Sequence, residues 1–271
     1  MWRLGTWIGL VLALGCGVVS AAPKTLGIFV GNNSFPALTG RDLRGCVNDA
    51  NLLAGTFRQV WGEVEERRLY NVSVGEFVAA LRQAVDRCRS GEVRRLVITI
   101  SSHGTTIPGA EADGAGEAVV FSDVDADMTR GLLTDRELRG MLDQIPPSVG
   151  VELLLDTCFS GGATRGLKVA RAVQPMARYL PHPRFRPGVD RVVRRKSRSA
   201  GPEHMAEWAA AGETELAWDD ALAGRYQGVF TYVWVRNFLS NPTHSRAALI
   251  GLVKDEVGRG GYEQTPQLLT R

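Results

Sequence analysis

The sequence predicts an α/β fold in which helices cover both faces of a mainly parallel sheet. Predicted strands and helices alternate along the 271 residues, which is typical of strand–helix–strand units. Predicted strands such as residues 96–100 are continuous apolar runs, as expected of strands that are buried on both faces. The composition agrees, because 44% hydrophobic and 23% charged residues are ordinary globular usage. It excludes collagen-like, coiled-coil and disordered chains.

Apolar patterns and capping signals define the elements of the first half. Short apolar runs predict strands at residues 25–30, 67–70 and 95–101, and apolar residues recur at helical spacing over 44–61. Ser73 and Glu76 form a capping box that opens a second helix, which ends at Arg89. Loops are expected over residues 31–40, where Gly and Asn gather, and over residues 102–116.

The second half is predicted with one long interruption. Short strands are expected over residues 118–121 and 151–155, and a capping box of Thr134 and Glu137 opens a helix to Ile145. Residues 165–198 have no clean periodicity and predict a long exposed loop. Regular structure resumes over residues 203–211, 229–239 and 243–257, the last of these a helix, and ends in an edge strand at 265–269.

Charge is distributed unevenly along the chain. The net charge is only +3, but residues 165–198 hold eleven Lys or Arg and one acid, giving +10 in this segment. The rest of the chain therefore carries −7. Because the basic charge is confined to one segment, the average gives no ground for expecting nucleic acid as a partner.

Residues 1–22 predict a secretory signal peptide. Arg3 precedes a short apolar run over residues 8–14, and small residues lead to a cleavage site after Ala21. The run is too short to favour a permanent spanning helix. We therefore expect an exported protein, periplasmic or extracellular. The alternative is a lipoprotein attached through Cys16, although the usual Leu three residues before that cysteine is absent.

Three cysteines remain after this cleavage, an odd number for an oxidising compartment. Cys46 and Cys88 lie in apolar helical patterns, so we expect buried free thiols, with a disulfide between them as the alternative. Cys158 is the remaining thiol, and the residues around it in the sequence indicate a reactive group.

Reactive residues follow two of the predicted strands. Strand 95–101 runs into the sequence SHG, which holds His103, and strand 151–155 runs into DTCFSGG, which holds Cys158. Ligand sites of open parallel sheets lie beyond the carboxyl ends of the strands, so neighbouring strands would bring these two side chains together. The pair predicts a thiolate nucleophile with a histidine base.

With these motifs, the sequence resembles the caspase-like cysteine peptidases, and among them the metacaspases and their prokaryotic relatives. His103 and Cys158 are 55 residues apart, similar to the spacing of about 50 in caspases. The Asp-Thr pair before the cysteine is similar to metacaspases. Residues 43–50 (LRGCVNDA), 228–232 (GVFTY) and 264–267 (QTPQ) resemble further blocks of that family.

The resemblance implies a fold, a domain organisation and a mechanism. The fold is a caspase-like three-layer sandwich with a mostly parallel six-stranded sheet and helices on both faces. One peptidase domain would span residues 23–271, with a large-subunit-like part at 23–164, a basic linker at 165–200 and a small-subunit-like part at 201–271. His103 and Cys158 would act as a dyad, without a third member and without a cofactor. The N–H groups of Gly104 and Cys158 are candidates for stabilising the oxyanion.

The resemblance also implies the substrate, because metacaspases prefer Arg or Lys before the scissile bond. The matching pocket residues are Asp49 and Asp156, with Ser101 and Cys46 lining the site. Two carboxylates would pair with a guanidinium and reject an aspartate. The alternative is that Asp49 only caps its helix and Asp156 only ends its strand. As partners we expect peptides or proteins with basic residues, no nucleic acid and no membrane, and we expect a monomer.

Calcium binding is common in metacaspases, and acidic residues between His103 and Cys158 are weak candidates for it. They are Asp113, Asp123, Asp125, Asp127 and Asp135. The spacing of three of them resembles the start of an EF-hand, but Met128 stands where Gly is needed and Thr134 where the closing Glu belongs. An ordinary solvated acidic loop is the favoured interpretation, and Ca²⁺ stays an alternative.

The basic segment is a candidate substrate of the protein's own site. An Arg-rich loop tethered near an acidic pocket is present at high effective concentration. We hypothesise self-cleavage within residues 191–198, after Arg194, Arg195, Lys196 or Arg198. An uncleaved loop that binds anionic surfaces is the alternative.

For the whole protein, the sequence predicts a cysteine endopeptidase that cleaves after Arg or Lys. The first alternative is a catalytically silent caspase-like binding module that uses the basic segment for contacts. The second is a hydrolase of non-peptide amides or esters with the same pair of residues.

Overall fold

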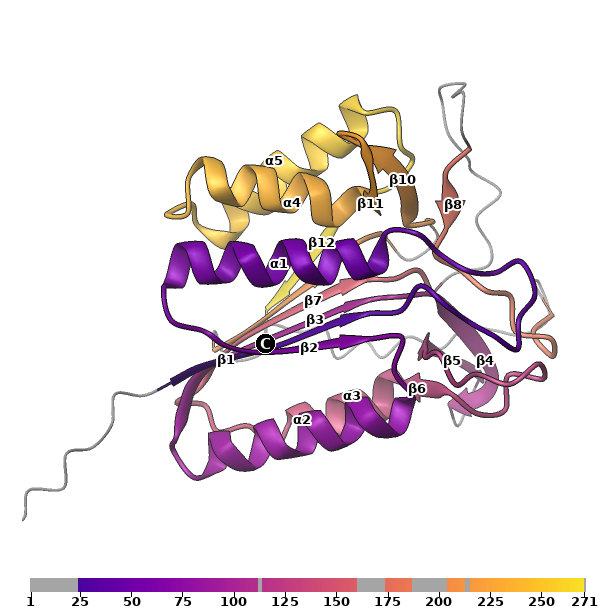
Figure 1. Ribbon diagram of the computed structural model, residues 1–271, viewed down its shortest axis with the longest axis horizontal. Helices are drawn as coiled ribbons and strands as arrows, with labels where there is room; N and C mark the ends of the chain where they lie inside the picture. Colours follow the sequence, from indigo (N-terminus) through magenta and orange to yellow (C-terminus); the bar gives the residue numbers. More distant parts are fainter. Residues whose placement is uncertain (1–23, 112–113, 160–173, 187–203, 213–214, 271) are drawn as a thin grey trace, which may run out of the picture.

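The protein is built around a six-stranded sheet with helices on both faces (Figure 1). The computed structural model describes residues 24–111, 114–159, 174–186, 204–212 and 215–270. The strand order is β12-β9-β7-β3-β1-β2. These strands are β1 (Lys24–Gly31), β2 (Glu65–Tyr70), β3 (Val93–Ser101), β7 (Gly150–Asp156), β9 (Met205–Ala209) and β12 (Gln267–Thr270). All neighbouring pairs are parallel except β12, which runs antiparallel to β9 at the edge. The predicted α/β class and three-layer sandwich are confirmed.

Apolar side chains alternate between the two faces of the central strands. In β1, Ile28 packs with α2 (Val74–Arg89) and α3 (Asp135–Leu142), whereas Phe29 points to the other face. That face is covered by α1 (Cys46–Trp61), α4 (Val229–Ser240) and α5 (Arg246–Arg259) (Figure 1). Both faces are buried, which is why the strands are continuously apolar in sequence.

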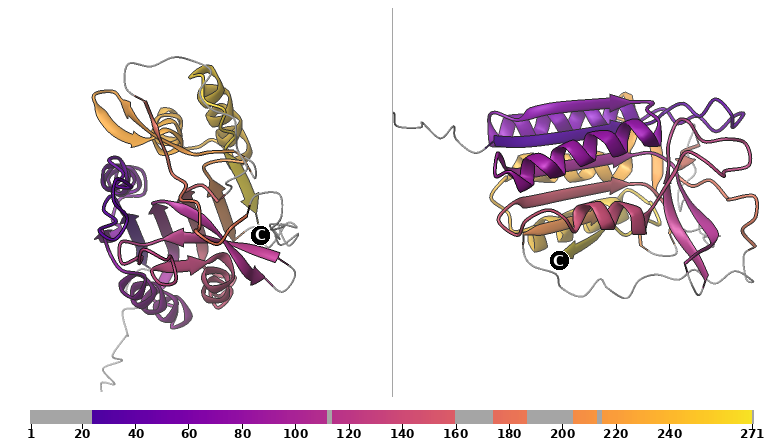
Figure 2. Two further views of the ribbon diagram at one scale, coloured as in Figure 1. Left: turned by 90° about the vertical axis from the view of Figure 1, so that its right-hand side faces the viewer. Right: turned by 90° about the horizontal axis from the view of Figure 1, so that it is seen from below.

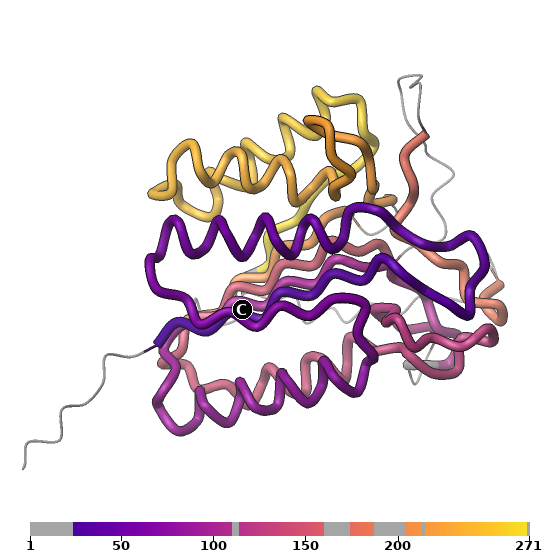
Figure 3. The backbone as a smooth tube through the Cα atoms, in the orientation of Figure 1, coloured from indigo at the N-terminus to yellow at the C-terminus, as the bar shows by residue number. Residues whose placement is uncertain are grey.

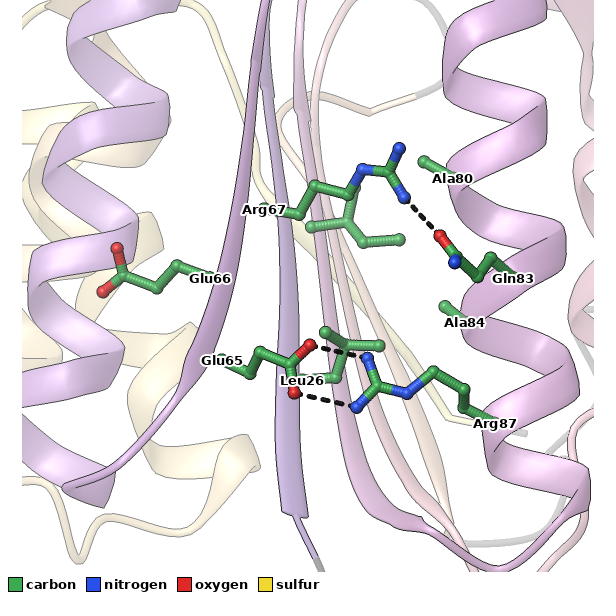
Figure 4. A pocket seen from close by; sticks show the side chains of 9 residues that line it. Leu26, Glu65, Glu66, Arg67, Ala80, Gln83, Ala84 and Arg87 are labelled. Carbon is green, nitrogen blue, oxygen red and sulfur yellow. Dashed lines mark hydrogen bonds and ion pairs between the residues drawn. The ribbon is translucent and has the colours of Figure 1, made fainter.

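Charged side chains cover the sheet edge at β2. Arg87 of α2 donates two hydrogen bonds, of 2.7 and 2.8 Å, to the carboxylate of Glu65, and Arg67 donates one to Gln83 (Figure 4). Glu66 pairs with Arg68 on the same strand. Charges at an exposed edge strand disfavour pairing with another chain.

Two small sheets lie at the carboxyl ends of the parallel strands (Figures 1 and 2). One joins β4 (Gly104–Glu111), β5 (Gly114–Val120) and β6 (Leu132–Thr134), and the other joins β8 (Met176–Ala177), β10 (Trp218–Leu222) and β11 (Arg225–Gly228). The predicted loop over residues 102–116 is therefore wrong, because most of it forms a hairpin. Its Gly- and Ala-rich strands lack the apolar alternation that would have revealed them.

Several predicted boundaries shift by a few residues. The helix opened by Thr134 ends at Leu142 rather than at Ile145, and α5 begins after Ser245, whose hydroxyl accepts a hydrogen bond from the N–H of Ala248. Cys46 and Cys88 are buried free thiols, as predicted. None of the helices within the described ranges is long and apolar enough to cross a membrane.

Part of the basic segment contradicts the prediction of an exposed loop. Residues 174–186, called the inserted segment below, run along the end of the sheet next to the loop between β1 and α1 (Figure 3). Arg178 is 0% exposed, Leu180 3% and His182 5%. The sequence showed only a run of basic residues, whereas the groups that bury Arg178 come from distant parts of the chain.

The capping box of α2 gives a test of the local analysis. Ser73 accepts a hydrogen bond from the N–H of Glu76, and the Glu76 carboxylate accepts one from the N–H of Ser73. We expect Ser73→Ala to lower the free energy of unfolding by about 1 kcal/mol, because an N–H at the helix start loses its acceptor. Urea unfolding measures this, with Ser73→Thr as the control that keeps a hydroxyl. Equal losses in the two variants would contradict the analysis.

Candidate active site

Two neighbouring strands place His103 and Cys158 at the same end of the sheet. β3 and β7 are paired in register, with Ser101 opposite Asp156. His103 and Cys158 each follow two residues after these positions. Both side chains are buried. The order of the strands thus places the predicted nucleophile and the predicted base at the same end of the sheet.

His103 has one ring nitrogen fixed and the other available. Nε2 lies 2.7 Å from the backbone carbonyl oxygen of Arg41, and a carbonyl can only accept, so Nε2 carries the hydrogen. Nδ1 is buried and has no hydrogen-bond partner among the residues that the structure describes. Burial lowers the pKa of His103 to about 4, against the opposing effect of the hydrogen bond to Arg41. The ring is therefore neutral at pH 7, with a free lone pair on Nδ1.

Cys158 is held by backbone groups on two sides. Its Sγ donates to the carbonyl oxygen of Glu215 at 2.9 Å, and its backbone N–H donates to the carbonyl oxygen of Arg178 at 3.3 Å. The N–H of Gly104 donates to the same Arg178 oxygen at 2.9 Å. The two N–H groups that were candidates for the oxyanion site thus converge on one carbonyl of the inserted segment.

The side chain of Arg178 lies among three buried carboxylates, which are called the acid pocket below. Its Nη2 is 2.6 Å from Oδ2 of Asp49 and 3.5 Å from Oδ1 of Asp219, and its Nη1 is 3.1 Å from Oδ1 of Asp156. Nη1 also donates to the backbone carbonyl of Asp156 at 3.1 Å. Three acids and a carbonyl around one guanidinium form a site for a basic side chain.

Each carboxylate is held in place by a group other than Arg178. Asp49 accepts from the N–H of Gly228, Asp156 from the hydroxyl and N–H of Thr231, and Asp219 from the N–H groups of Arg44 and Gly45. Burial, and then the neighbouring carboxylates, raise the pKa of Asp49 to about 7, although Arg178 opposes this. Each acid of the acid pocket is therefore also positioned by hydrogen bonds that do not involve Arg178.

Two glycines permit close approaches within the site. A Cβ at Gly104 would overlap the carbonyl oxygen of Cys158, and a Cβ at Gly228 would overlap Oδ2 of Asp156 and lie 2.7 Å from Nη1 of Arg178. Only glycine permits these close approaches. Both positions fall within or next to motifs quoted in the sequence analysis.

The inserted segment crosses the site as an extended chain. β8 pairs antiparallel with β10, with Ala177 opposite Trp218, and the N–H of Arg178 donates to the carbonyl of Ala217 at 2.9 Å. Beyond Arg178, the N–H of Leu180 donates to the carbonyl of Gly104 at 2.9 Å. Both sides of the Arg178–Tyr179 bond are therefore fixed by backbone pairing.

The structure brings together most of the predicted site residues and adds others. Asp49 and Asp156 both contact Arg178. Cys46 is fully buried, and burial raises the pKa of its thiol well above the usual value, although Arg178 opposes this. Ser101 is buried, and its backbone carbonyl accepts from the N–H of Asn32. Four groups of the site were not predicted from the sequence: the side chains of Asp219 and Arg178 and the carbonyls of Arg41 and Glu215. Asp219 alone carried a signal, as an acid next to Trp218 within an apolar stretch.

Three of the candidate calcium ligands form hydrogen bonds or ion pairs with their own surroundings. Asp125 accepts from Thr129 and Arg130, Asp123 accepts from the N–H of Val74, and Asp135 pairs with Arg139. No group of three or more His, Cys, Asp or Glu that could hold a metal ion occurs in the part of the chain that the structure describes. Asp113 lies outside it. Calcium binding by the predicted residues stays a prediction.

Comparison with known proteins identifies the family of this chain. The caspase domain model matches residues 24–271. The chain belongs to the caspase family. It is 31% identical to Metacaspase-4 of Arabidopsis thaliana over 148 residues, which are 50% of this chain and 33% of that protein. It is 22% identical to Metacaspase-1A of Aspergillus clavatus, over 83% of this chain and 62% of that one. The protein is thus a metacaspase-like member of the family, and it spans about a third of the length of the plant relative.

Solved structures show the same fold. The crystal structure of a Geobacter sulfurreducens protein matches 91% of this chain and 93% of its own, with a TM-score of 0.64 and 17% identity. Caspase-1 from Spodoptera frugiperda matches 92% of this chain and 89% of its own, with a TM-score of 0.62 and 11% identity. These likenesses establish the caspase-like architecture.

The buried His103 predicts a pH-dependent stability. An unfolded histidine titrates near pH 6.5, whereas His103 titrates at about 4 in the folded protein. At pH 5 the unfolded chain therefore binds a proton that the folded chain does not. We expect the free energy of unfolding to fall by about 2 kcal/mol from this group between pH 7 and pH 5.

Urea unfolding of the Cys158→Ala protein at the two pH values measures this loss. The loss should be smaller by that amount in Cys158→Ala/His103→Gln, where the ring is absent. The same pH dependence in both proteins, or a His103 pKa near 6.5 by NMR, would show that the ring is not held neutral.

Proposed function

We propose that the protein is a cysteine endopeptidase that cleaves after Arg or Lys, with Cys158 as nucleophile and His103 as base. One observation carries this proposal: Arg178 places its guanidinium in the acid pocket while its carbonyl accepts from the N–H groups of Gly104 and Cys158. That is the arrangement which a peptide bond after Arg needs for attack by the neighbouring thiol. The likeness to metacaspases supports the same class of enzyme.

In this mechanism the proton moves between Cys158 and His103. The thiol turns from the Glu215 carbonyl and gives its proton to Nδ1 of His103, while the Arg41 carbonyl stabilises the imidazolium through Nε2–H. The thiolate attacks the carbonyl carbon, and the two N–H groups stabilise the negative oxygen. The C–N bond then breaks, and the leaving amine takes the proton from His103. Water hydrolyses the thioester with His103 as base, which restores the thiol.

Charge complementarity supports the choice of Arg or Lys. Asp49, Asp156 and Asp219 each have an oxygen within 3.5 Å of the guanidinium of Arg178. A substrate Asp at this position would face three carboxylates without a compensating cation, which costs several kcal/mol. The acid pocket therefore favours a cation and rejects an acid.

The same geometry supports self-processing in the basic linker, at the bond between Arg178 and Tyr179. A segment of the same chain is present at an effective concentration that no free peptide reaches. As long as that bond is intact, the segment also excludes other substrates from the acid pocket. The earlier candidates Arg194, Arg195, Lys196 and Arg198 lie outside the described residues and remain predictions.

Turnover of short peptides tests the enzymatic proposal. We expect peptides ending in Arg or Lys to be cleaved and those ending in Asp to be left intact. Cys158→Ala should abolish the activity. Asp219→Asn should lower kcat/KM for Arg peptides about tenfold to hundredfold, because one charge-assisted contact is lost. The control is Asp220→Asn, which changes a neighbouring acid that pairs with Tyr262. Binding of basic peptides without any turnover would instead favour the silent binding module.

Mass spectrometry of the purified chain tests self-processing. We expect the wild type to yield a new N-terminus at Tyr179, and Cys158→Ala to stay intact at this bond. Arg178→Gln should block this cut, because the guanidinium that holds the bond in place is gone. Arg184→Gln, at an exposed arginine of the same segment, should not. A wild type that stays intact at this bond while it cleaves Arg peptides would contradict self-processing here.

A further inference from the structure

An apolar pocket next to the acid pocket holds the side chain of Leu180. Leu180 is 3% exposed and lies in a buried apolar cluster that also holds Cys46, at the start of α1, and five larger residues: Phe35, Leu43, Val120, Val124 and Met128. These residues come from the loop between β1 and α1, from the end of β5 and from the turn that follows it. We refer to these five residues as the leucine pocket. It accepts a residue on the opposite side of the Arg178–Tyr179 bond from the acid pocket.

The backbone fixes which position of a bound chain reaches this pocket. The N–H of Leu180 donates to the carbonyl of Gly104, and the N–H of Gly104 donates to the carbonyl of Arg178. Both bonds are 2.9 Å long, and they bracket the Arg178–Tyr179 peptide. Because Gly104 also supplies a group at the oxyanion position, any substrate that is aligned for attack places its second residue after the scissile bond here.

The leucine pocket is held open by contacts that do not involve Leu180. The N–H of Phe35 donates to Asp42 at 2.8 Å, and the N–H of Leu43 donates to the carbonyl of Asn33 at 2.8 Å. Met128 has φ of +52°, in the left-handed region that is costly for a side chain of this size, and its N–H donates to the carbonyl of Asp125. A strained backbone persists only where its surroundings impose it.

The lining of the pocket selects aliphatic side chains. The five residues offer no charged or hydrogen-bonding side chain to a group that enters, and the Cys46 thiol of the same cluster is only a weak donor. Burying a Leu there gains free energy that a Gly does not gain, whereas an Asp would lose its water without finding a partner. The pocket is therefore specific in size and polarity.

We propose that the protein reads substrates on both sides of the scissile bond: a basic residue before it, and Leu or a similar aliphatic residue at the second position after it. This inference rests on the proposed peptidase function and adds a second determinant to it. The residue in the leucine pocket leaves with the amine product. It therefore acts on formation of the thioester and has no influence on its hydrolysis.

Two kinds of substrate separate the two proposals. Peptides of sequence Ala-Arg-Tyr-Xaa, with Xaa as Leu, Gly or Asp, are assayed on the full-length Arg178→Gln/Leu180→Gly chain, whose own segment lacks the two side chains that fill the acid pocket and the leucine pocket. We expect kcat/KM to be about tenfold to hundredfold higher for Leu than for Gly, and lower still for Asp. An Arg-aminocoumarin substrate ends at the scissile bond, so its turnover reports on the basic-side reaction alone. Equal kcat/KM for the three peptides, with turnover of the coumarin substrate, would overturn the leucine pocket and leave the peptidase intact.

Binding of Leu180 in the leucine pocket can also be measured in a protein without peptidase activity. In the full-length Cys158→Ala protein, trypsin can cut after Arg178 only when the inserted segment leaves the site. We expect Leu180→Asp to speed this cut, followed by mass spectrometry at Tyr179, about tenfold or more. Leu252→Asp, at an exposed leucine of α5, should leave it unchanged. If no substrate is turned over, the peptidase proposal fails, and the trypsin experiment alone tests whether the leucine pocket binds Leu180. An unchanged rate of cleavage in Leu180→Asp would overturn the leucine pocket.

Discussion

The site depends on one electrostatic contact, between the guanidinium of Arg178 and the carboxylates of Asp49, Asp156 and Asp219. All four side chains are buried, and a buried charge is costly unless charged and hydrogen-bonding partners compensate it. The three acids lie on α1, at the end of β7 and on β10. One cation thus joins a helix, the central sheet and a peripheral sheet that are far apart in sequence.

The same contact connects the fold to the chemistry. Once the guanidinium is in the acid pocket, backbone pairing with β10 and Gly104 leaves the Arg178 carbonyl no place except beside the two N–H groups near Cys158. An arginine side chain therefore positions the bond that follows it. In the function proposed above, the inserted segment would be at once a bound substrate and a barrier to other substrates.

The sequence allowed the fold and the reactive pair to be predicted for a clear physical reason. Apolar strands buried on both faces are the strongest sequence pattern in α/β proteins, and His103 and Cys158 stand directly behind two of them. Asp49 and Asp156 followed from the resemblance to metacaspases, and they meet at Arg178 in the structure.

The remaining parts of the site had no signature in the sequence. The carbonyls of Arg41 and Glu215 are backbone groups that every residue possesses, so their role cannot be predicted from the type of residue. Arg178 is one of eleven basic residues in its segment, and only the three-dimensional arrangement distinguishes it from the others. The β4–β5 hairpin was missed because its small residues give no alternating pattern.

A crystal structure of the full-length Cys158→Ala protein shows directly which side chain fills the acid pocket. We expect the Arg178 guanidinium to lie within hydrogen-bond distance of Asp49, with the Arg178 carbonyl facing the N–H of Gly104 and Leu180 buried against Met128. An acid pocket filled by water, or by a different basic residue of the linker, would contradict it.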